Sequence, residues 1–145
     1  ERDTPVSMDH IRILAAQDPA NPYGGIVPWP EVTNPDRAKP RRVSGAWLIL
    51  ARGRPVLYAA RRARSLITFP AAIRDDESAL DAAIAALRHL PRTARSGMLS
   101  IEKVDGQAVS DSPLLPRFLA AGYARDYRGL IDVQPSGQSV ERRNG

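Results

Sequence analysis

The chain has 145 residues, of which 43% are hydrophobic and 26% are charged, and a formal net charge of +5; this length fits one domain with its own core. The absence of cysteine excludes disulfides, thiolate nucleophiles and zinc–thiolate sites, and with two histidines a histidine-built metal site is not expected. Because no apolar run reaches membrane-spanning length and no secretory pattern opens the sequence, we expect a cytoplasmic protein with no membrane partner.

Residues 1–42 are rich in proline and polar residues, and one stretch at 8–17 is helical in pattern. The dense prolines of 18–30 exclude a helix or an interior strand there. Tyr23 and Trp29 are large aromatics that favour burial, which is unusual in a free linker. We therefore expect 1–42 to be a proline-rich, partly ordered N-terminal segment.

The pattern changes at residue 43. Two short apolar runs, 45–51 and 55–60, flank a turn at Arg52-Gly53-Arg54 and predict a β-hairpin. A basic tip then leads into 65–69, which we expect to be the third strand of the same meander, closed by Pro70.

Helical signals follow the meander. Asp75 and Asp76 are candidate N-caps for a helix that runs to Leu90, since Leu80, Ile84 and Leu87 recur at helical spacing.

Two further strands and a helix are expected after this helix. Residues 98–104 alternate like a half-buried strand and end at the Asp105-Gly106 turn. A helix over 113–121 follows the cap Ser112, and a broken strand covers 123–133. The predicted fold is α+β, a mixed sheet with an antiparallel three-strand meander followed by helix–strand–helix–strand. Residues 43–135 form its core domain and 136–145 a polar tail.

Several catalytic motifs are absent from the sequence. It has no Gly-x-x-x-x-Gly-Lys-Ser/Thr loop, no Gly-x-Gly-x-x-Gly turn and no Gly-x-Ser-x-Gly elbow. The chain alone is therefore not a P-loop ATPase, and we expect it to hold no cofactor and to lack an enzymatic activity of its own.

Arginines are the candidate binding residues. A basic surface attracts nucleic acid, although a solvated arginine-rich surface explains the charge equally well. One group lies at the two ends of a predicted hairpin strand, and a second is flanked by Tyr123 and Tyr127, an interleaving that can bind phosphates and stack bases. The candidates for nucleic-acid binding are Arg52, Arg54, Arg61, Arg62, Arg64, Arg125 and Arg128.

Carboxylates give a weaker signal. Asp126 and Asp132 lie beside the second basic group and are the candidates for general acid–base work, but nothing in their spacing pairs them.

An ordered set of blocks extends from about residue 15 to about residue 133. The blocks are 18–24 with 28–30, 42–50 with Gly53 and 56–58, 64–69, 101–106, 112–115 and 128–130. This ordered set resembles the C-terminal part of the bacterial large helicase-related (Lhr) proteins.

The resemblance implies a parent protein that is a superfamily 2, ATP-dependent DNA helicase, with ATP and magnesium in motor domains outside this chain. It implies that the chain belongs to a C-terminal extension with winged-helix and barrel-like parts. In some relatives this extension is linked to oligomerisation and to uracil-DNA glycosylase activity. No glycosylase motif can be placed on a residue of this sequence.

Three functions remain open. The first is a non-catalytic accessory domain of a DNA repair helicase that contributes DNA binding or assembly. The second is a docking or oligomerisation module that contacts other domains or subunits through the apolar segment 26–30. The third is a part of a uracil glycosylase site, which needs a carboxylate and a pocket for a flipped base.

Overall fold

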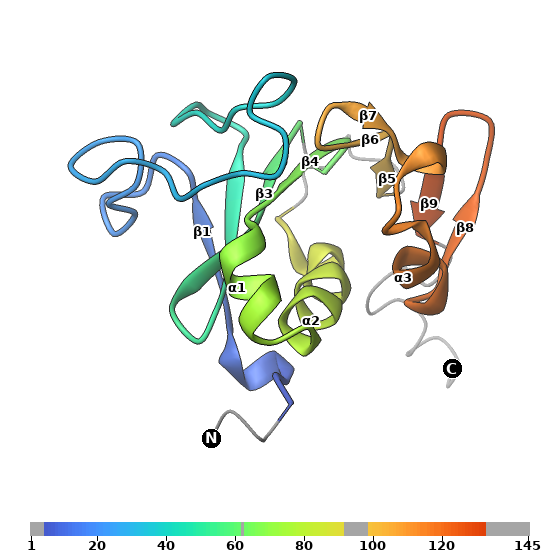
Figure 1. Cartoon of the computed structure of the whole chain (residues 1–145), viewed down its shortest axis with the longest axis horizontal. Coiled ribbons are helices and arrows are strands. Elements are labelled where there is room, and N and C mark those ends of the chain that lie inside the picture. The colour runs from blue at the N-terminus through green and yellow to red at the C-terminus, as the bar shows by residue number, and fades with distance from the viewer. Residues whose placement is uncertain (1–4, 62, 92–98, 133–145) are drawn as a thin grey trace, which may run out of the picture.

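The computed structural model describes residues 5–61, 63–91 and 99–132 (Figure 1). The strands and helices are β1 (Ile11–Ala15), β2 (Trp47–Ala51), β3 (Arg54–Ala60), β4 (Ser65–Thr68), α1 (Pro70–Asp75), α2 (Ser78–Ala86), β5 (Ser100–Ile101), β6 (Lys103–Val104), β7 (Gln107–Ala108), α3 (Leu115–Ala120), β8 (Tyr123–Arg125) and β9 (Leu130–Asp132). Short 3-10 helices cover Met8–His10, Leu87–His89 and Val109–Asp111.

Two sheets organise these elements. The larger sheet has the order β1-β2-β3-β4-β6-β7, antiparallel except where β4 and β6 run parallel, and the smaller sheet has the antiparallel order β5-β9-β8. The predicted α+β class is confirmed, and β2, β3 and β4 form the predicted antiparallel meander. The β2–β3 turn takes positive φ at Arg52 (50°) and Gly53 (82°), which suits a two-residue hairpin turn.

The predicted helical stretch at 8–17 is wrong. A 3-10 turn at Met8–His10 is followed by strand β1, which pairs in antiparallel register with β2. Ile11 and Ile13 alternate with the exposed Arg12, and both pack against the core. A β-branched residue on each side of an exposed one suits a half-buried strand better than a helix.

The helix expected from Asp75–Asp76 to Leu90 is confirmed as α2, which the 3-10 helix at Leu87–His89 continues, whereas the separate short helix α1 before it is not predicted by the sequence. The Asp76 carboxylate accepts a hydrogen bond from Ser78 N (3.1 Å) and so stabilises the start of α2. The strand expected at 98–104 changes sheet at Glu102, so that β5 pairs with β9 and β6 pairs with β4. Met98, Val133 and the predicted tail lie outside the described residues.

Both faces of the larger sheet are covered (Figure 1). On one face Ile49, Leu57 and Leu66 pack in the core cluster that includes Leu80 and Ile84 of α2. On the opposite face the proline-rich loop covers the sheet.

The loop is attached to that opposite face through aromatic and polar contacts. The Trp29 ring stacks on Phe69 at 6.4 Å and meets the Tyr58 ring edge-on at 5.7 Å. The Tyr58 hydroxyl donates to Arg41 O (2.8 Å) and accepts from Arg41 N (3.1 Å). Burial raises the pKa of the Tyr58 hydroxyl above its ordinary value, so it remains a donor at neutral pH.

Within the described residues, no helix has the length and apolar character that crossing a bilayer requires.

Candidate nucleic-acid interface

The first group of candidate arginines occupies two opposite ends of the meander. Arg52 and Arg54 lie at the β2–β3 turn, whereas Arg61 and Arg64 lie in the loop between β3 and β4. Arg62 lies outside the described residues. The structure therefore separates these arginines into two sites.

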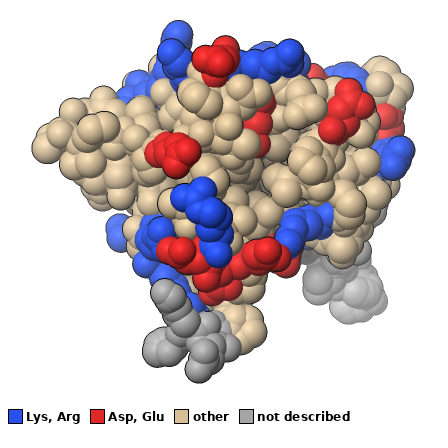
Figure 2. Space-filling model, in the orientation of Figure 1, with Lys and Arg blue, Asp and Glu red and all other residues tan. Residues whose placement is uncertain are grey.

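Carboxylates accompany the arginines of the β2–β3 turn. Arg54 lies 2.6 Å from Asp75, and Arg52 lies 3.5 Å from Asp76. Figure 2 shows acidic side chains close to basic ones over the visible face. Asp75 and Asp76 therefore offset positive charge at this turn.

The other end of the meander meets the second predicted arginine group. The Glu102 carboxylate lies 4.0 Å from Arg64 Nε and 3.8 Å from Arg128 Nη1. Backbone contacts fix this arrangement, because Arg64 O accepts hydrogen bonds from Glu102 N (2.8 Å) and Lys103 N (2.9 Å). Arginines that the sequence places in two groups, Arg64 and Arg128, are therefore brought together at Glu102.

Tyr127 is the exposed aromatic of this region. Its side chain is 87% exposed, and the Arg128 guanidinium lies 5.2 Å from the ring centroid. Arg128 Nε and Nη2 each donate to the Tyr127 hydroxyl at 3.1 Å. These hydrogen bonds raise the pKa of the Arg128 guanidinium, which stays charged. An exposed ring beside a cation is an arrangement that stacks bases and contacts phosphates.

The two tyrosines of the predicted cluster have different environments. Tyr123 is buried, its hydroxyl donates to Ile84 O (3.2 Å), and the Arg88 guanidinium lies 4.6 Å from its ring. It belongs to the core, whereas Arg125 on the same hairpin is exposed. We define the Arg–Tyr cluster as Arg64, Glu102, Arg125, Tyr127 and Arg128.

Asp126 shapes the loop that carries this cluster. Its Oδ1 accepts hydrogen bonds from Arg128 N (2.8 Å) and Gly129 N (3.3 Å). It also lines a hollow of about 200 Å³ together with Glu102, Arg125 and Tyr127. The carboxylate is exposed, so a water molecule or a ligand can reach it.

Asp132 lies elsewhere. It is opposite Tyr123 in the β8–β9 register, whereas Asp126 lies in the loop at the other end of that hairpin. Its side chain is 1% exposed and accepts a hydrogen bond from Arg88 Nε at 2.8 Å. The two candidate carboxylates therefore do not form one site.

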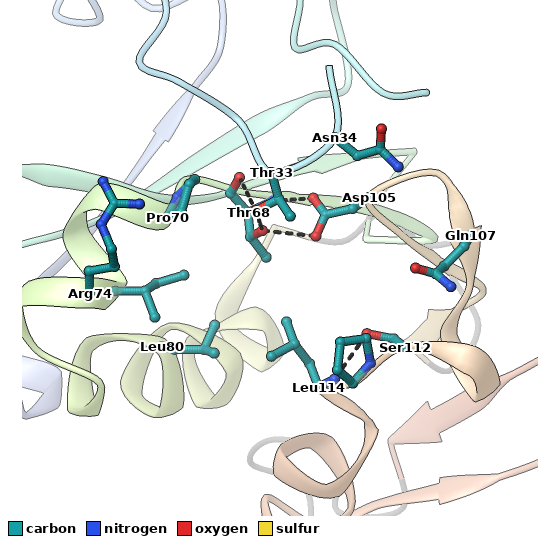
Figure 3. A pocket seen from close by; sticks show the side chains of 12 residues that line it. Thr33, Asn34, Thr68, Pro70, Arg74, Leu80, Asp105, Gln107, Ser112 and Leu114 are labelled. Carbon is teal, nitrogen blue, oxygen red and sulfur yellow. Dashed lines mark hydrogen bonds between the residues drawn. The ribbon is translucent and has the colours of Figure 1, made fainter. Parts of the chain in front are cut away.

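The sequence patterns did not reveal a cavity of about 300 Å³ beside Asp105 (Figure 3). Asp105 is 8% exposed and accepts hydrogen bonds from Thr68 N and Thr68 Oγ1, both at 2.8 Å. Burial raises the pKa of the Asp105 carboxyl above its ordinary value of 3.8, although both hydrogen bonds act in the opposite direction. In the sequence, Asp105 is part of the turn before Gly106 and one of several carboxylates that no spacing pairs. Across the part of the chain that the structure describes, no group of three or more His, Cys, Asp or Glu residues could hold a metal ion.

Comparison with protein-family models gives no match. Among curated proteins, a Mycolicibacterium smegmatis protein described as "Lhr helicase/ probable uracil glycosylase" is 38% identical over 128 residues, which is 83% of this chain and 8% of the relative. An Escherichia coli protein described as "Lhr helicase/uracil glycosylase" is 28% identical over 122 residues, which is 81% of this chain and 7% of the relative. The chain thus spans less than a tenth of the length of the curated relatives it matches.

Proposed function

Because this chain is homologous to a portion of the Lhr helicase/uracil glycosylase proteins, we propose that it serves such a protein as a non-catalytic accessory domain that binds single-stranded DNA through the Arg–Tyr cluster. The single observation that carries this proposal is the exposed Tyr127 ring with Arg128 against it. A base that stacks on such a ring contributes about 1–3 kcal/mol to binding.

The charge around Tyr127 supports the same function. Arg64, Arg125 and Arg128 outnumber the carboxylates of Glu102 and Asp126. Guanidinium groups pair with phosphate oxygens through two parallel hydrogen bonds. Glu102 lies 4.0 Å from Arg64 and 3.8 Å from Arg128, and both arginine side chains remain half-exposed and accessible to a phosphate.

The activities of the whole protein are part of the proposal. We expect ATP hydrolysis, with its ATP and magnesium, and DNA unwinding to belong to other parts of the parent protein. The present domain would then hold the strand during DNA repair in the cytoplasm.

The test is fluorescence anisotropy of the chain with labelled single-stranded and double-stranded DNA across a salt series. Tyr127→Ala should weaken single-strand binding by about fivefold to a hundredfold. Arg128→Ala should also reduce the slope of log affinity against log salt by about 0.7, the value for one phosphate contact on a single strand.

Arg54→Ala is the matched control, because it removes a guanidinium that lies beside Asp75 at the opposite end of β3. It should leave affinity within about a factor of two, since a strand bound at the Arg–Tyr cluster does not contact a guanidinium at the opposite end of β3. Equal losses in Arg54→Ala and Arg128→Ala, or no binding at low salt, would contradict the proposal.

A second candidate function is docking on other domains or subunits. Ile26 is 92% exposed at the tip of a loop that is internally hydrogen-bonded, with Gly24 N donating to Val27 O at 2.7 Å. Arg42 holds the base of this loop by donating to Tyr23 O at 3.0 Å. Ile26→Ser should then abolish any concentration-dependent increase in mass, measured by sedimentation, and leave DNA affinity unchanged.

Uracil excision is the third candidate, suggested by the descriptions of the relatives. Asp126 beside the 200 Å³ hollow is its best-placed carboxylate, since Asp132 is buried against Arg88. Release of uracil by the chain, and loss of that release in Asp126→Asn at unchanged stability, is the result that this function requires.

A further inference from the structure

The cavity beside Asp105 is formed by segments far apart in the sequence (Figure 3). Thr33 comes from the N-terminal loop, Thr68 from the end of β4, Leu80 from α2, and Leu114 from the turn before α3. Its volume of about 300 Å³ reaches the lower range of ligand-binding pockets, which are mostly apolar with a few converging polar groups.

The walls of this cavity have distinct chemical character. Leu80 and Leu114 lie across the cavity from the Asp105 carboxylate, and Ile73 adds a further apolar surface. The side-chain amides of Asn34 and Gln107 lie on the polar side. A ligand that fits must therefore have a polar end and an apolar body.

Hydrogen bonds set the polarity of the deep end. Thr68 uses its amide and its hydroxyl proton as donors to Asp105, one to each carboxylate oxygen. Because the Thr68 hydroxyl proton is committed to Asp105, the Thr33 hydroxyl must be the donor in its contact with Thr68 Oγ1. A carboxylate has about four acceptor positions, so Asp105 can accept further hydrogen bonds. The deep end of the cavity therefore favours ligand groups that donate hydrogen bonds to Asp105.

Asp105 has no ion-pair partner within the described residues. Two arginines lie near the cavity. Arg74 lines the same cavity from α1 with an exposed side chain, and the backbone of Arg37 packs against Gly106. Neither lies within ion-pair distance of the carboxylate. A buried carboxylate without a countercharge is unfavourable, as the raised pKa of Asp105 indicates.

We propose that this cavity binds a small organic cation, whose protonated nitrogen donates to Asp105 and whose apolar body packs on Ile73, Leu80 and Leu114. The cation supplies both the missing countercharge and the missing donor. A neutral alcohol of the same shape supplies apolar contact and one donor but no countercharge. This site shares no residue with the Arg–Tyr cluster and does not depend on DNA binding.

The test uses benzylamine as the probe and benzyl alcohol as its neutral counterpart, with binding to the full chain followed by isothermal titration calorimetry. Benzylamine should bind with a Kd of about 1 mM or tighter, and at least about tenfold more tightly than benzyl alcohol. Affinity for the amine should fall as the pH is lowered, because protonation of Asp105 removes its charge while the amine remains protonated.

Two variants and one control complete the experiment. Asp105→Asn keeps the shape but removes the charge, and should weaken benzylamine binding at least about tenfold. Leu114→Trp should block the cavity to both probes while Asp105 remains. Asp111→Asn changes an exposed carboxylate in the nearby 3-10 helix and should have no effect. Folding of each variant is checked by its thermal melt. Equal affinity for the two probes, unchanged affinity in Asp105→Asn, or no binding would overturn the proposal.

Discussion

Asp132 accepts a hydrogen bond from Arg88 Nε at 2.8 Å, with 1% and 13% of the two side chains exposed. Arg88, in the 3-10 helix that follows α2, also donates to Ala121 O at 2.6 Å, so this side chain connects the end of β9 and the end of α3 to that 3-10 helix. A carboxylate held in this way supports the fold rather than a reaction at the surface.

Asp132→Asn is therefore expected to lower the free energy of unfolding by about 3 kcal/mol, because it leaves the Arg88 cation buried without its countercharge. Urea denaturation followed by circular dichroism measures the change. Asp126→Asn is the control at the other end of the same hairpin and should change the free energy by less than about 0.5 kcal/mol. Equal effects of the two substitutions would show that the ion pair does not stabilise the domain.

Gly129→Ala tests the closeness of β8–β9 to β5. A Cβ at Gly129 would overlap the carbonyl oxygen of Ile101, which belongs to the backbone and cannot rotate away. The free energy of unfolding should fall by about 2 kcal/mol or more. Gly53→Ala, where nothing lies within 4 Å, should be destabilised by about 1 kcal/mol through its positive φ alone. Chemical denaturation measures the unfolding free energy of both variants. A larger loss in Gly53→Ala than in Gly129→Ala would contradict the close packing of Gly129 against Ile101.

The Asp105 carboxyl gives a pH dependence of known sign. Because its pKa is raised in the folded state above the ordinary 3.8, the folded protein binds more protons than the unfolded chain between the two pKa values. The stability that this group contributes is therefore greatest below the ordinary pKa and is lost as the pH rises through the folded pKa. Denaturation at a series of pH values should show the wild type losing stability relative to Asp105→Asn over this interval. A difference in unfolding free energy between the two proteins that does not change with pH would argue against a raised pKa of Asp105.

Tyr58→Phe probes the attachment of the N-terminal loop. The substitution removes the hydroxyl that donates to Arg41 O and accepts from Arg41 N. A loss of about 1 kcal/mol in unfolding free energy is expected for these partly buried hydrogen bonds. The fluorescence of Trp29, which packs edge-on against Tyr58, should shift at lower urea concentrations than in the wild type. Tyr127→Phe, on an exposed ring, serves as the control and should leave stability unchanged.

Features encoded by neighbouring residues could be predicted from the sequence. The turns at Arg52-Gly53 and Asp105-Gly106 both adopt positive φ, as their composition indicates, and the meander between β2 and β4 follows from its apolar runs. The sequence predicts a helix in place of strand β1 because the partner strand β2 lies more than thirty residues further along the chain.

The candidate site was predictable in its residue types but not in its arrangement. Arg64 and Arg128 belong to separate motifs, and their meeting at Glu102 depends on a chain that changes sheet at that residue. The same holds for Asp105, whose burial depends on Thr33 and Thr68 from distant segments. Contacts between distant segments arise from packing, which local patterns do not record.

The pairing of β1 with β2 has a practical consequence for how this domain is produced. Without β1, strand β2 would end the sheet with a row of unpaired backbone N–H and C=O groups beside the apolar side chains of Leu48 and Leu50. Exposed edges of this kind pair with other copies and promote aggregation. A shortened protein that begins at residue 43 should therefore precipitate or form large assemblies, whereas one that retains β1 should stay dispersed.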